Sequence, residues 1–274
     1  MKEIAGKAAL VTGGGNGIGR AIAVALADAG ASVLVADIDG AGADAAAVEI
    51  RESGRKAIGV ACDVAADGCF ESLRDRMLAE FDRADIIVNN AGTLLSGLPL
   101  DIPLSEWRRV FEINLMSAVR SNAAFLPGLI ARGEGHIVNT ASFAGLYGYA
   151  YDRLPYAASK AALISLSEGL ALYLRPLGIG MTCLCPGPVR TTIMSRAKFL
   201  NAGLEMRSPG PQFPLLEPET VGAQLVDAIR KNRFFLPTDP QVRDVLMRRA
   251  DDLDGFVDHQ IEHPHIVVPA RLPV

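Results

Sequence analysis

Several residue patterns that mark specialised proteins are scarce in this sequence. Its 274 residues include four cysteines, Cys62, Cys69, Cys183 and Cys185, at spacings that match no metal site. Cys183 and Cys185 alternate in an expected strand and point to one face of it, where disulfide geometry is unfavourable. Because thiols stay reduced in the cytosol, we expect four free cysteines in a cytoplasmic protein that holds no metal.

An excess of basic residues is also missing. Lysine and arginine number 27 against 31 aspartates and glutamates, which gives a net charge of −4 and favours neither nucleic acid nor an anionic membrane as a partner. Charges such as Glu168 interrupt the apolar helices, and the first residues lead directly into a strand, so we expect no membrane span and no signal peptide. A hydrophobic content of 50% is typical of one soluble globular domain of this length.

Short apolar segments alternate with segments of helical periodicity along the chain. The apolar segments span residues 8–12, 32–37, 56–63, 85–90, 135–142, 180–185 and 233–236. Helices are expected over 18–29, 41–53 and 68–82, and from about residues 105 and 156 onward. Strands that are apolar throughout, each followed by a helix, predict a parallel sheet covered on both faces, and right-handed crossovers make it doubly wound. The fold class is therefore α/β.

Unusual residues gather where these strands end. The ends carry the glycine loop over residues 13–19, Asp37, Asp63, residues 89–92, Ser142 and residues 186–187. In an open parallel sheet, ligands bind beyond the carboxyl ends of the strands. Glycines let the backbone turn tightly and let a pyrophosphate approach the N-terminus of the next helix. A tight turn without a ligand is the alternative for the glycine loop taken alone.

An acidic residue follows the glycine loop at a distance typical of a dinucleotide site. Asp37 lies 18 residues beyond Gly19 and would accept hydrogen bonds from ribose hydroxyls. A 2′-phosphate about 5 Å away would be repelled by roughly 3 kcal/mol at most. Neither Asn16 nor Ile38 is basic, so we predict NAD(H) as the cofactor. The alternatives are a turn aspartate for Asp37 and, for Asp63, a helix cap in place of an acceptor for adenine.

A tyrosine and a lysine stand four positions apart in YAASK, residues 156–160. On a helix this spacing places Tyr156 and Lys160 side by side. A cation within a few ångströms stabilises a phenolate and lowers the tyrosine pKa from about 10. The spacing therefore predicts a phenol acidic enough to act as a general base. The alternative is a surface pair whose polar ends reach water.

Taken together, these motifs resemble the short-chain dehydrogenase/reductase family. TGGGNGIG, Asp63-Val64, NNAG, Asn114, Ser142, Tyr156 with Lys160, and PGPVRT occur in the family's order over residues 6–238. The resemblance implies a Rossmann fold with a seven-stranded sheet, a nicotinamide dinucleotide, and hydride transfer between an alcohol and a carbonyl compound. It also implies a homotetramer or a homodimer. We expect residues 1–238 to form this single domain and residues 239–274 to extend it.

The resemblance also implies roles for single residues. Ser142 would donate to the substrate oxygen, Lys160 would hold the nicotinamide ribose, and Asn114 would support a water-mediated proton path. A structural amide is the alternative for Asn114, and a helix N-cap is the alternative for Thr191, which would otherwise bind the carboxamide. The remaining cofactor contacts would come from Gly13, Gly15, Asn16, Gly17, Ile18, Gly19, Ile38, Val64, Asn90, Ala91, Gly92, Tyr156, Pro186, Gly187 and Val189.

The substrate region is predicted to be apolar and aromatic. Its expected lining is Thr93, Leu94, Phe143, Tyr149, Tyr151, Met194 and Phe199, with a flap over residues 190–218. Arg153, Arg190 and Arg196 are expected to face water. This lining favours a hydrophobic secondary alcohol or ketone as the small-molecule substrate. A catalytically idle dinucleotide-binding regulator and a lyase or epimerase that reuses the same tyrosine are the alternatives.

The C-terminal extension is predicted to contain one amphipathic helix. Its apolar residues would be Val242, Val245, Leu246 and Leu253. The histidines at 259, 263 and 265 flank a proline without a metal-binding helix motif, so no metal is expected there. The apolar tail over residues 266–274 is expected to pack on a surface and to cover a substrate pocket.

Overall fold

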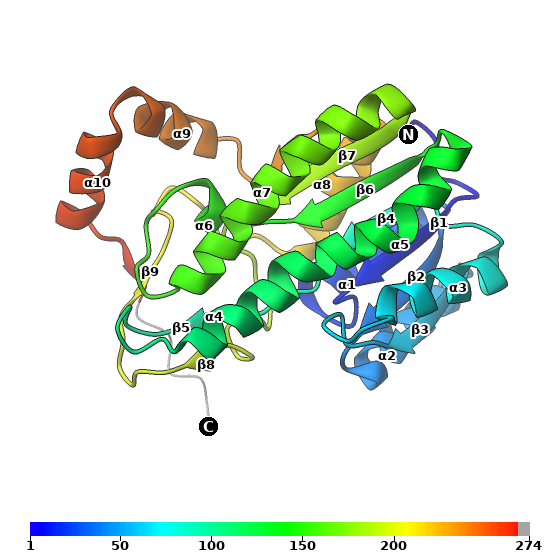
Figure 1. Cartoon of the computed structure of the whole chain (residues 1–274), viewed down its shortest axis with the longest axis horizontal. Helices are drawn as coiled ribbons and strands as arrows, with labels where there is room; N and C mark the ends of the chain where they lie inside the picture. Colours follow the sequence, from blue (N-terminus) through cyan, green and yellow to red (C-terminus); the bar gives the residue numbers. More distant parts are fainter. Residues whose placement is uncertain (268–274) are drawn as a thin grey trace.

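A computed structural model describes residues 1–267 of the protein. Seven strands form one sheet in the order β10-β7-β6-β4-β1-β2-β3 (Figure 1). Every neighbouring pair is parallel. The strands are β1 (Ala8–Thr12), β2 (Ser32–Asp37), β3 (Ala57–Ala61), β4 (Ile86–Asn89), β6 (Gly135–Thr140), β7 (Ile179–Cys185) and β10 (Phe235–Pro237).

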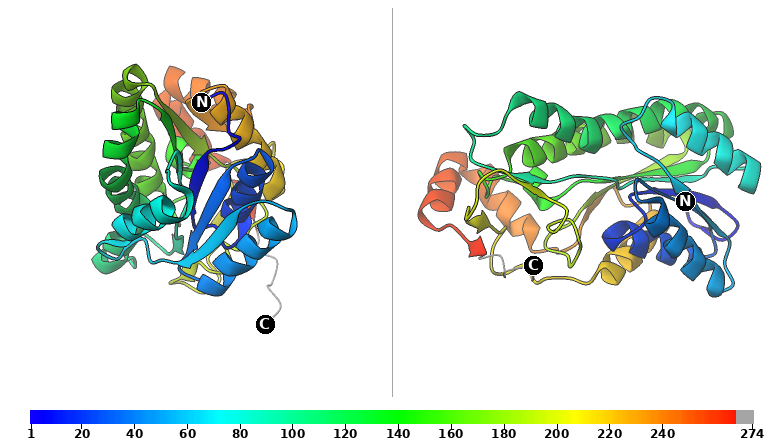
Figure 2. Two further views of the ribbon diagram at one scale, coloured as in Figure 1. Left: turned by 90° about the vertical axis from the view of Figure 1, so that its right-hand side faces the viewer. Right: turned by 90° about the horizontal axis from the view of Figure 1, so that it is seen from below.

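Helices cover both faces of this sheet, as the view along it shows (Figure 2). One face packs against α1 (Gly17–Asp28), α2 (Gly40–Glu52) and α8 (Pro218–Arg230). The other packs against α3 (Cys69–Phe81), α5 (Ser117–Arg132) and α7 (Leu154–Leu174). The predicted α/β fold, a doubly wound seven-stranded parallel sheet with helices on both faces, is confirmed.

The alternation of side chains along β1 explains why the strands are apolar throughout. Ala9 and Val11 point into the core beneath α1 and α8, whereas Ala8 and Leu10 point into the core beneath α3 and α5. Both faces of the strand are therefore buried. The chain leaves β1 toward β2 on one side and later returns to β4 on the other, and ligands of open parallel sheets bind where the strand order reverses in this way.

Smaller elements surround the carboxyl ends of the strands. In the flap, β8 (Lys198–Phe199) pairs in parallel with β5 (Leu95–Ser96), and β9 (Met206–Arg207) pairs antiparallel with β11 (Ile266–Val267). Short helical elements complete the chain: α4 (Leu104–Phe111), the π-helical turn η1 (Glu112–Met116), α6 (Phe143–Leu146) and the 3₁₀ turn η2 (Arg175–Leu177). Within residues 1–267, no helix is both long and apolar enough to cross a bilayer.

The prediction of one C-terminal helix is wrong, because the chain breaks at Asp252. Two helices form, α9 (Val242–Asp251) and α10 (Leu253–Glu262), and both project from the body (Figure 1). The Asp252 carboxylate accepts a hydrogen bond from Gly255 N at 2.9 Å and so caps a new helix. Val242 and Val245 are buried as expected, but Leu253 is exposed on α10. Most of the apolar tail, residues 268–274, lies outside the described residues.

A buried histidine in the sheet makes stability depend on pH. His136 on β6 is fully buried, its Nε2 lies 2.8 Å from Thr182 Oγ1, and burial lowers its pKa to about 3. The unfolded chain binds a proton near pH 6.5, but the folded chain stays neutral, so stability falls as the pH drops below 6.5. Between pH 7 and pH 5 this site should remove about 2 kcal/mol from the free energy of unfolding. Urea unfolding at both pH values should show a smaller loss in His136→Asn than in the unmodified protein, and equal losses would contradict the assignment.

Candidate active site

The glycine loop between β1 and α1 has a shape that depends on its glycines. Gly13 and Gly17 have positive φ angles of 62° and 50°, which side chains disfavour. A Cβ on Gly13 would lie 2.9 Å from Ala91 Cα, and one on Gly19 would collide with the Gly13 carbonyl oxygen. The Asn16 side chain does not cap α1, because its Oδ1 accepts from Thr192 Oγ1 at 2.7 Å. The first turn of α1 therefore keeps N–H groups available for a phosphate, as a dinucleotide site requires.

Asn90 holds this loop in place from the neighbouring strand. Its side-chain nitrogen donates to Thr12 O at 3.1 Å and to Gly13 O at 3.2 Å, and its backbone N–H donates to Thr12 Oγ1 at 3.0 Å. Asn90 and Ala91 thus sit directly against the glycine loop, as the sequence predicts. The Asn90 side chain has a structural role in this structure, because both of its hydrogen-bond acceptors are backbone carbonyls of the loop.

Asp37 lies at the end of β2 and faces the same loop. One carboxylate oxygen accepts from Gly15 N at 2.9 Å and the other from Asp39 N at 3.0 Å. The flap residue Arg196 reaches Asp39 at 3.5 Å, a contact between segments far apart in the sequence. Ile38 beside them is 72% exposed.

Asp63 does not cap α3, so the helix-cap alternative for this residue is wrong, because the N-cap residue of that helix is Gly68. Asp63 is exposed, and its Oδ1 accepts from Ala65 N at 2.9 Å, which closes a turn at the end of β3. Val64 next to it is buried. A carboxylate engaged in this way still has a second oxygen for a ligand.

Ser142, Tyr156 and Lys160 come together beyond the ends of β6 and β7. Tyr156 and Lys160 are 9% and 3% exposed, so the alternative of a surface pair is wrong. Lys160 Nζ lies 5.7 Å from the centre of the Tyr156 ring and donates to Thr140 O at 2.7 Å. Ser142 is hydrogen-bonded to the Tyr156 phenol, and its Oγ accepts from Ala144 N at 3.2 Å.

The pKa of Tyr156 differs from the expectation. Burial raises this pKa above its usual value, whereas the hydrogen bond to Ser142 and the positive charge of Arg153 lower it. Burial also lowers the pKa of Lys160 to about 8. The prediction that Lys160 makes the phenol more acidic is therefore wrong in this structure. The reason is geometric, because the ammonium group lies beside the ring and donates to Thr140.

Asn114 lies in the π-helical turn η1, a type of distortion often found at functional sites. Its Oδ1 accepts from Thr93 N at 2.8 Å, and its Nδ2 donates to Thr93 O at 3.1 Å and to Ser159 Oγ at 3.0 Å. The interpretation as a structural amide is therefore confirmed. The carboxamide and Lys160 Nζ also lie close to each other across Gly92, within 3.4 and 3.5 Å of the point where a Cβ would stand.

The end of β7 and the start of the flap complete the site. Gly187 N donates to Thr238 Oγ1 at 2.9 Å, and Pro186 O accepts from Phe143 N at 2.9 Å. Thr191 lies against Gly17, so the flap begins directly over the glycine loop. No helix follows Thr191 within the flap, only turns and short strands, and the expected helix-capping alternative for this residue is therefore wrong. Val189 bridges to Leu216 across the flap.

The side chains around Tyr156 are apolar, as predicted, but only part of the expected set is present. Leu94, Tyr149 and Met194 pack around it together with Ala144, Ala157, Ile193 and Ala197. Phe143 turns instead toward Phe213, with ring centres 5.0 Å apart. Tyr151 and Phe199 are largely exposed. Arg190 and Arg196 are exposed as expected, but Arg153 is buried.

Comparison with known proteins accounts for this arrangement. Residues 7–201 match the short chain dehydrogenase family. The chain belongs to that family. Since members of the family use NAD(P), this short-chain dehydrogenase is an oxidoreductase that acts on CH–OH groups. A glycine loop beside an uncapped helix N-terminus fits the phosphates that such a cofactor carries.

Two curated relatives carry names of dehydrogenases. Human (Homo sapiens) 17-beta-hydroxysteroid dehydrogenase 13 is 32% identical over 86% of this chain and 77% of its own length. The 2,5-dichloro-2,5-cyclohexadiene-1,4-diol dehydrogenase of Sphingobium indicum is 37% identical over 75% of this chain and 81% of its own length. Both match most of this short-chain dehydrogenase.

Solved structures of similar proteins contain either dinucleotide. A short-chain dehydrogenase/reductase from Burkholderia phymatum in complex with NAD has a TM-score of 0.83 and 31% identity, over 93% of this chain and 96% of that one. A putative gluconate 5-dehydrogenase from Beutenbergia cavernae, with NADP bound at low occupancy, has a TM-score of 0.73 and 31% identity, over 87% and 97%. Proteins with folds similar to that of this short-chain dehydrogenase therefore bind either dinucleotide.

Sequence reasoning missed some residues of this short-chain dehydrogenase and misplaced Arg153. Ala144 and Ile193 stand next to predicted lining residues, so their positions could have indicated them. The burial of Arg153 had no comparable signal, because its hydrogen-bonding partner outside its own segment, Arg207, comes from the flap.

Proposed function

We propose that this enzyme interconverts a secondary alcohol and a ketone with NAD(H), and that its substrate is hydrophobic or aromatic. The observation that carries the proposal is a buried phenol, Tyr156, that lies among apolar side chains and beside Ser142 and Lys160. A phenol in this setting can exchange a proton with a substrate oxygen away from bulk water.

In this proposal, each side chain acts on the substrate oxygen or on its proton. Ser142 donates a hydrogen bond to the oxygen, where charge develops during the reaction. Tyr156 takes the hydroxyl proton during oxidation and returns it during reduction. The bound dinucleotide supplies the hydride acceptor or donor. Because burial raises the pKa of Tyr156, the phenol keeps its proton at neutral pH, so oxidation should speed up as the pH rises.

Lys160 and Asn114 would support this chemistry by holding the cofactor and by moving protons. The ammonium group of Lys160 would hold the ribose hydroxyls of the dinucleotide and pass protons toward Asn114, which lies next to it across Gly92. In the same assignment, the glycine loop, residues 13–19, would bind the pyrophosphate of the dinucleotide, and residues 186–191 would bind its nicotinamide end. Asn90, Ala91 and Gly92 would line the groove between these two ends.

The choice of NAD(H) is based on the negative charge of Asp37. Both of its oxygens accept backbone N–H groups, so the carboxylate is fixed beside the glycine loop and would repel a 2′-phosphate. The dinucleotide named in the Burkholderia phymatum complex is consistent with this choice. A hydrophobic substrate is supported by the apolar surroundings of Tyr156 and by the hydroxysteroid and cyclohexadiene-diol names of two relatives.

The proposal is tested with a panel of secondary alcohols and both dinucleotides, read by absorbance of the reduced nicotinamide. We expect NADH formation with hydrophobic cyclic alcohols. A regulator would produce no NADH with any alcohol, and a lyase or epimerase would convert its substrate without net NADH formation.

Removing the charge of Asp37 should weaken the discrimination between the dinucleotides. Asp37→Asn keeps an oxygen for the Gly15 N–H but removes the repulsion of a 2′-phosphate. We expect the ratio of kcat/KM for NAD to kcat/KM for NADP to fall about tenfold, because water screens part of the repulsion. The exposed Asp28→Asn at the end of α1 serves as the control. An unchanged ratio in Asp37→Asn would contradict this account of cofactor choice.

A further inference from the structure

A buried ion pair stands directly before the helix that carries Tyr156. Asp152 is fully buried, and Arg153, the N-cap residue of α7, is 8% exposed. The guanidinium donates to the Asp152 carboxylate from Nε at 3.1 Å and from Nη2 at 3.4 Å. Charged side chains are seldom buried this deeply unless they are paired, because removing a charge from water is costly. The two side chains therefore hold each other in a fixed position three residues before Tyr156.

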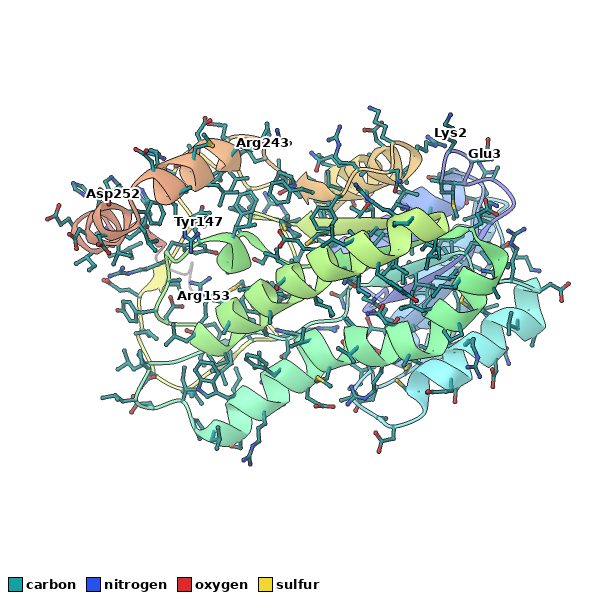
Figure 3. All side chains as sticks on the ribbon, turned by 45° about the horizontal axis from the view of Figure 1, so that its top comes forward. Lys2, Glu3, Tyr147, Arg153, Arg243 and Asp252 are labelled. Carbon is teal, nitrogen blue, oxygen red and sulfur yellow. The ribbon has the colours of Figure 1, made fainter. Side chains whose placement is uncertain are left out.

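This pair joins segments that are far apart in the sequence. Asp152 accepts from Ser96 Oγ at 3.3 Å and, through its backbone oxygen, from Gly97 N at 2.8 Å. Arg153 Nη2 donates to Arg207 O at 2.8 Å, and Figure 3 shows Arg153 between the start of α7 and the flap strand β9. The residues that lead into α7 are thus bonded both to the end of β5 and to the flap.

The same connection continues into the C-terminal extension. The guanidinium of Arg207 lies 4.7 Å from the centre of the Tyr151 ring, and its Nη1 donates to Gln260 O at 3.3 Å. The strand that contains Arg207 pairs with β11. Direct contacts therefore join the Asp152–Arg153 pair to the flap and to the C-terminal extension.

Few charged groups surround the phenol of Tyr156. The flap residues Ile193, Met194 and Ala197, which pack against the cluster that contains Tyr156, carry no charge. Ser142 is the hydrogen-bonding neighbour of the phenol, and Lys160 donates to Thr140. The charged and titratable groups close to the phenol are Arg153, Asp152, Tyr149 and Lys160. Of these, Arg153 is the cation that favours the phenolate forms of both Tyr149 and Tyr156.

We propose that Arg153, paired with Asp152, is a positioning residue for this reaction: it holds the start of α7 against the flap and keeps a positive charge beside the Tyr156 phenol. The inference rests on the proposed role of Tyr156 as the proton acceptor. Arginine suits both tasks, since its charge does not titrate and its planar group can bond a carboxylate and a carbonyl at once. A lysine could supply the charge but not the same set of bonds.

The test compares two replacements by their pH profiles for alcohol oxidation. Asp152→Asn with Arg153→Gln removes both charges without leaving a buried carboxylate unpaired. In this variant, the rise of kcat/KM with pH should occur at a pH about one unit higher than in the unmodified enzyme. At pH values below this rise, kcat/KM should be about tenfold lower than in the unmodified enzyme, and above it the two should be nearly equal. Arg153→Lys keeps the charge and should leave the pH of this rise unchanged while it raises KM, because the bond to the flap is lost. Should this double variant not fold, Asp152→Asn with Arg153→Met provides the same comparison, because it too leaves no buried carboxylate unpaired.

The outcomes separate this inference from the proposed function. Two results would overturn the role of Arg153. One is a fall in kcat/KM of equal size at every pH, and the other is a pH dependence of kcat/KM that does not shift in the neutral variants. If Tyr156→Phe retains activity, the base assignment itself fails. If Tyr156→Phe is inactive while the Arg153 variants leave the pH dependence unshifted, the base assignment stands and only the positioning role is lost. Circular dichroism and NADH binding verify that each variant is folded.

Discussion

Replacing Tyr156 with phenylalanine is expected to lower kcat roughly 10²–10⁴-fold, the range that a single acid–base group contributes. Phenylalanine fills the same space among Leu94, Ala144 and Met194, so the fold should be unaffected. NADH should still bind, because the Lys160 ammonium group donates to Thr140 and not to the phenol. NADH formation from the best alcohol of the panel measures the first effect, and a fluorescence titration with NADH measures the second.

The matched control for this variant lies on the same helix. Tyr173→Phe removes an identical hydroxyl from an exposed position on α7 and should leave kcat unchanged. Substantial turnover by Tyr156→Phe would show that another group exchanges the proton. Since burial raises the pKa of Tyr156, the unmodified enzyme should oxidise alcohols faster as the pH rises above neutrality and reduce ketones more slowly.

Replacing Gly19 with alanine is expected to weaken dinucleotide binding about 100-fold, which corresponds to about 3 kcal/mol. The added Cβ would collide with the Gly13 carbonyl oxygen and would lie 2.5 Å from Asn90 Nδ2. Both groups belong to the network that shapes the glycine loop, so the loop must shift away from the N-terminus of α1. An NADH titration measures the loss of affinity.

A second glycine provides the control. Gly169 lies on the exposed side of α7, and a Cβ there would meet nothing within 4 Å. Gly169→Ala should therefore leave NADH affinity unchanged and raise the free energy of unfolding by about 0.5–1 kcal/mol, because alanine favours the helix. Unchanged NADH affinity in Gly19→Ala would show that the glycine loop is not the dinucleotide site.

Elements with strong local signals were predicted well. The central strands β1, β4, β6 and β7 are buried on both faces, so their composition is unambiguous. Helix α3 begins and ends within one residue of the expected range of 68–82. Helix α8 was not predicted, although Val221, Leu225 and Ile229 recur at helical spacing and Pro218 stands at its first position. The C-terminal helix pair was predicted as a single helix, because the periodicity continues across Asp252 and only the cap interrupts it.

The site divides in the same way between local and distant causes. Tyr156 and Lys160 are neighbours because they share one helical turn, which is a local cause. Asn114 is a structural amide because it bonds Thr93 and Ser159, which lie 21 and 45 residues away in the sequence. By contrast, the apolar neighbours Phe143, Tyr151 and Phe199 were assigned to the substrate region by proximity in sequence, and each of them turns elsewhere.

The sequence by itself determined the order of strands and helices, the glycine loop and the identity of the reactive side chains, because these depend on residue types at short, regular spacings. Only the tertiary structure decided how acidic the phenol is and which cation lies beside it. Those properties depend on how much water is removed and on charges brought in from elsewhere in the fold, as the bond between Arg153 and the flap at Arg207 illustrates.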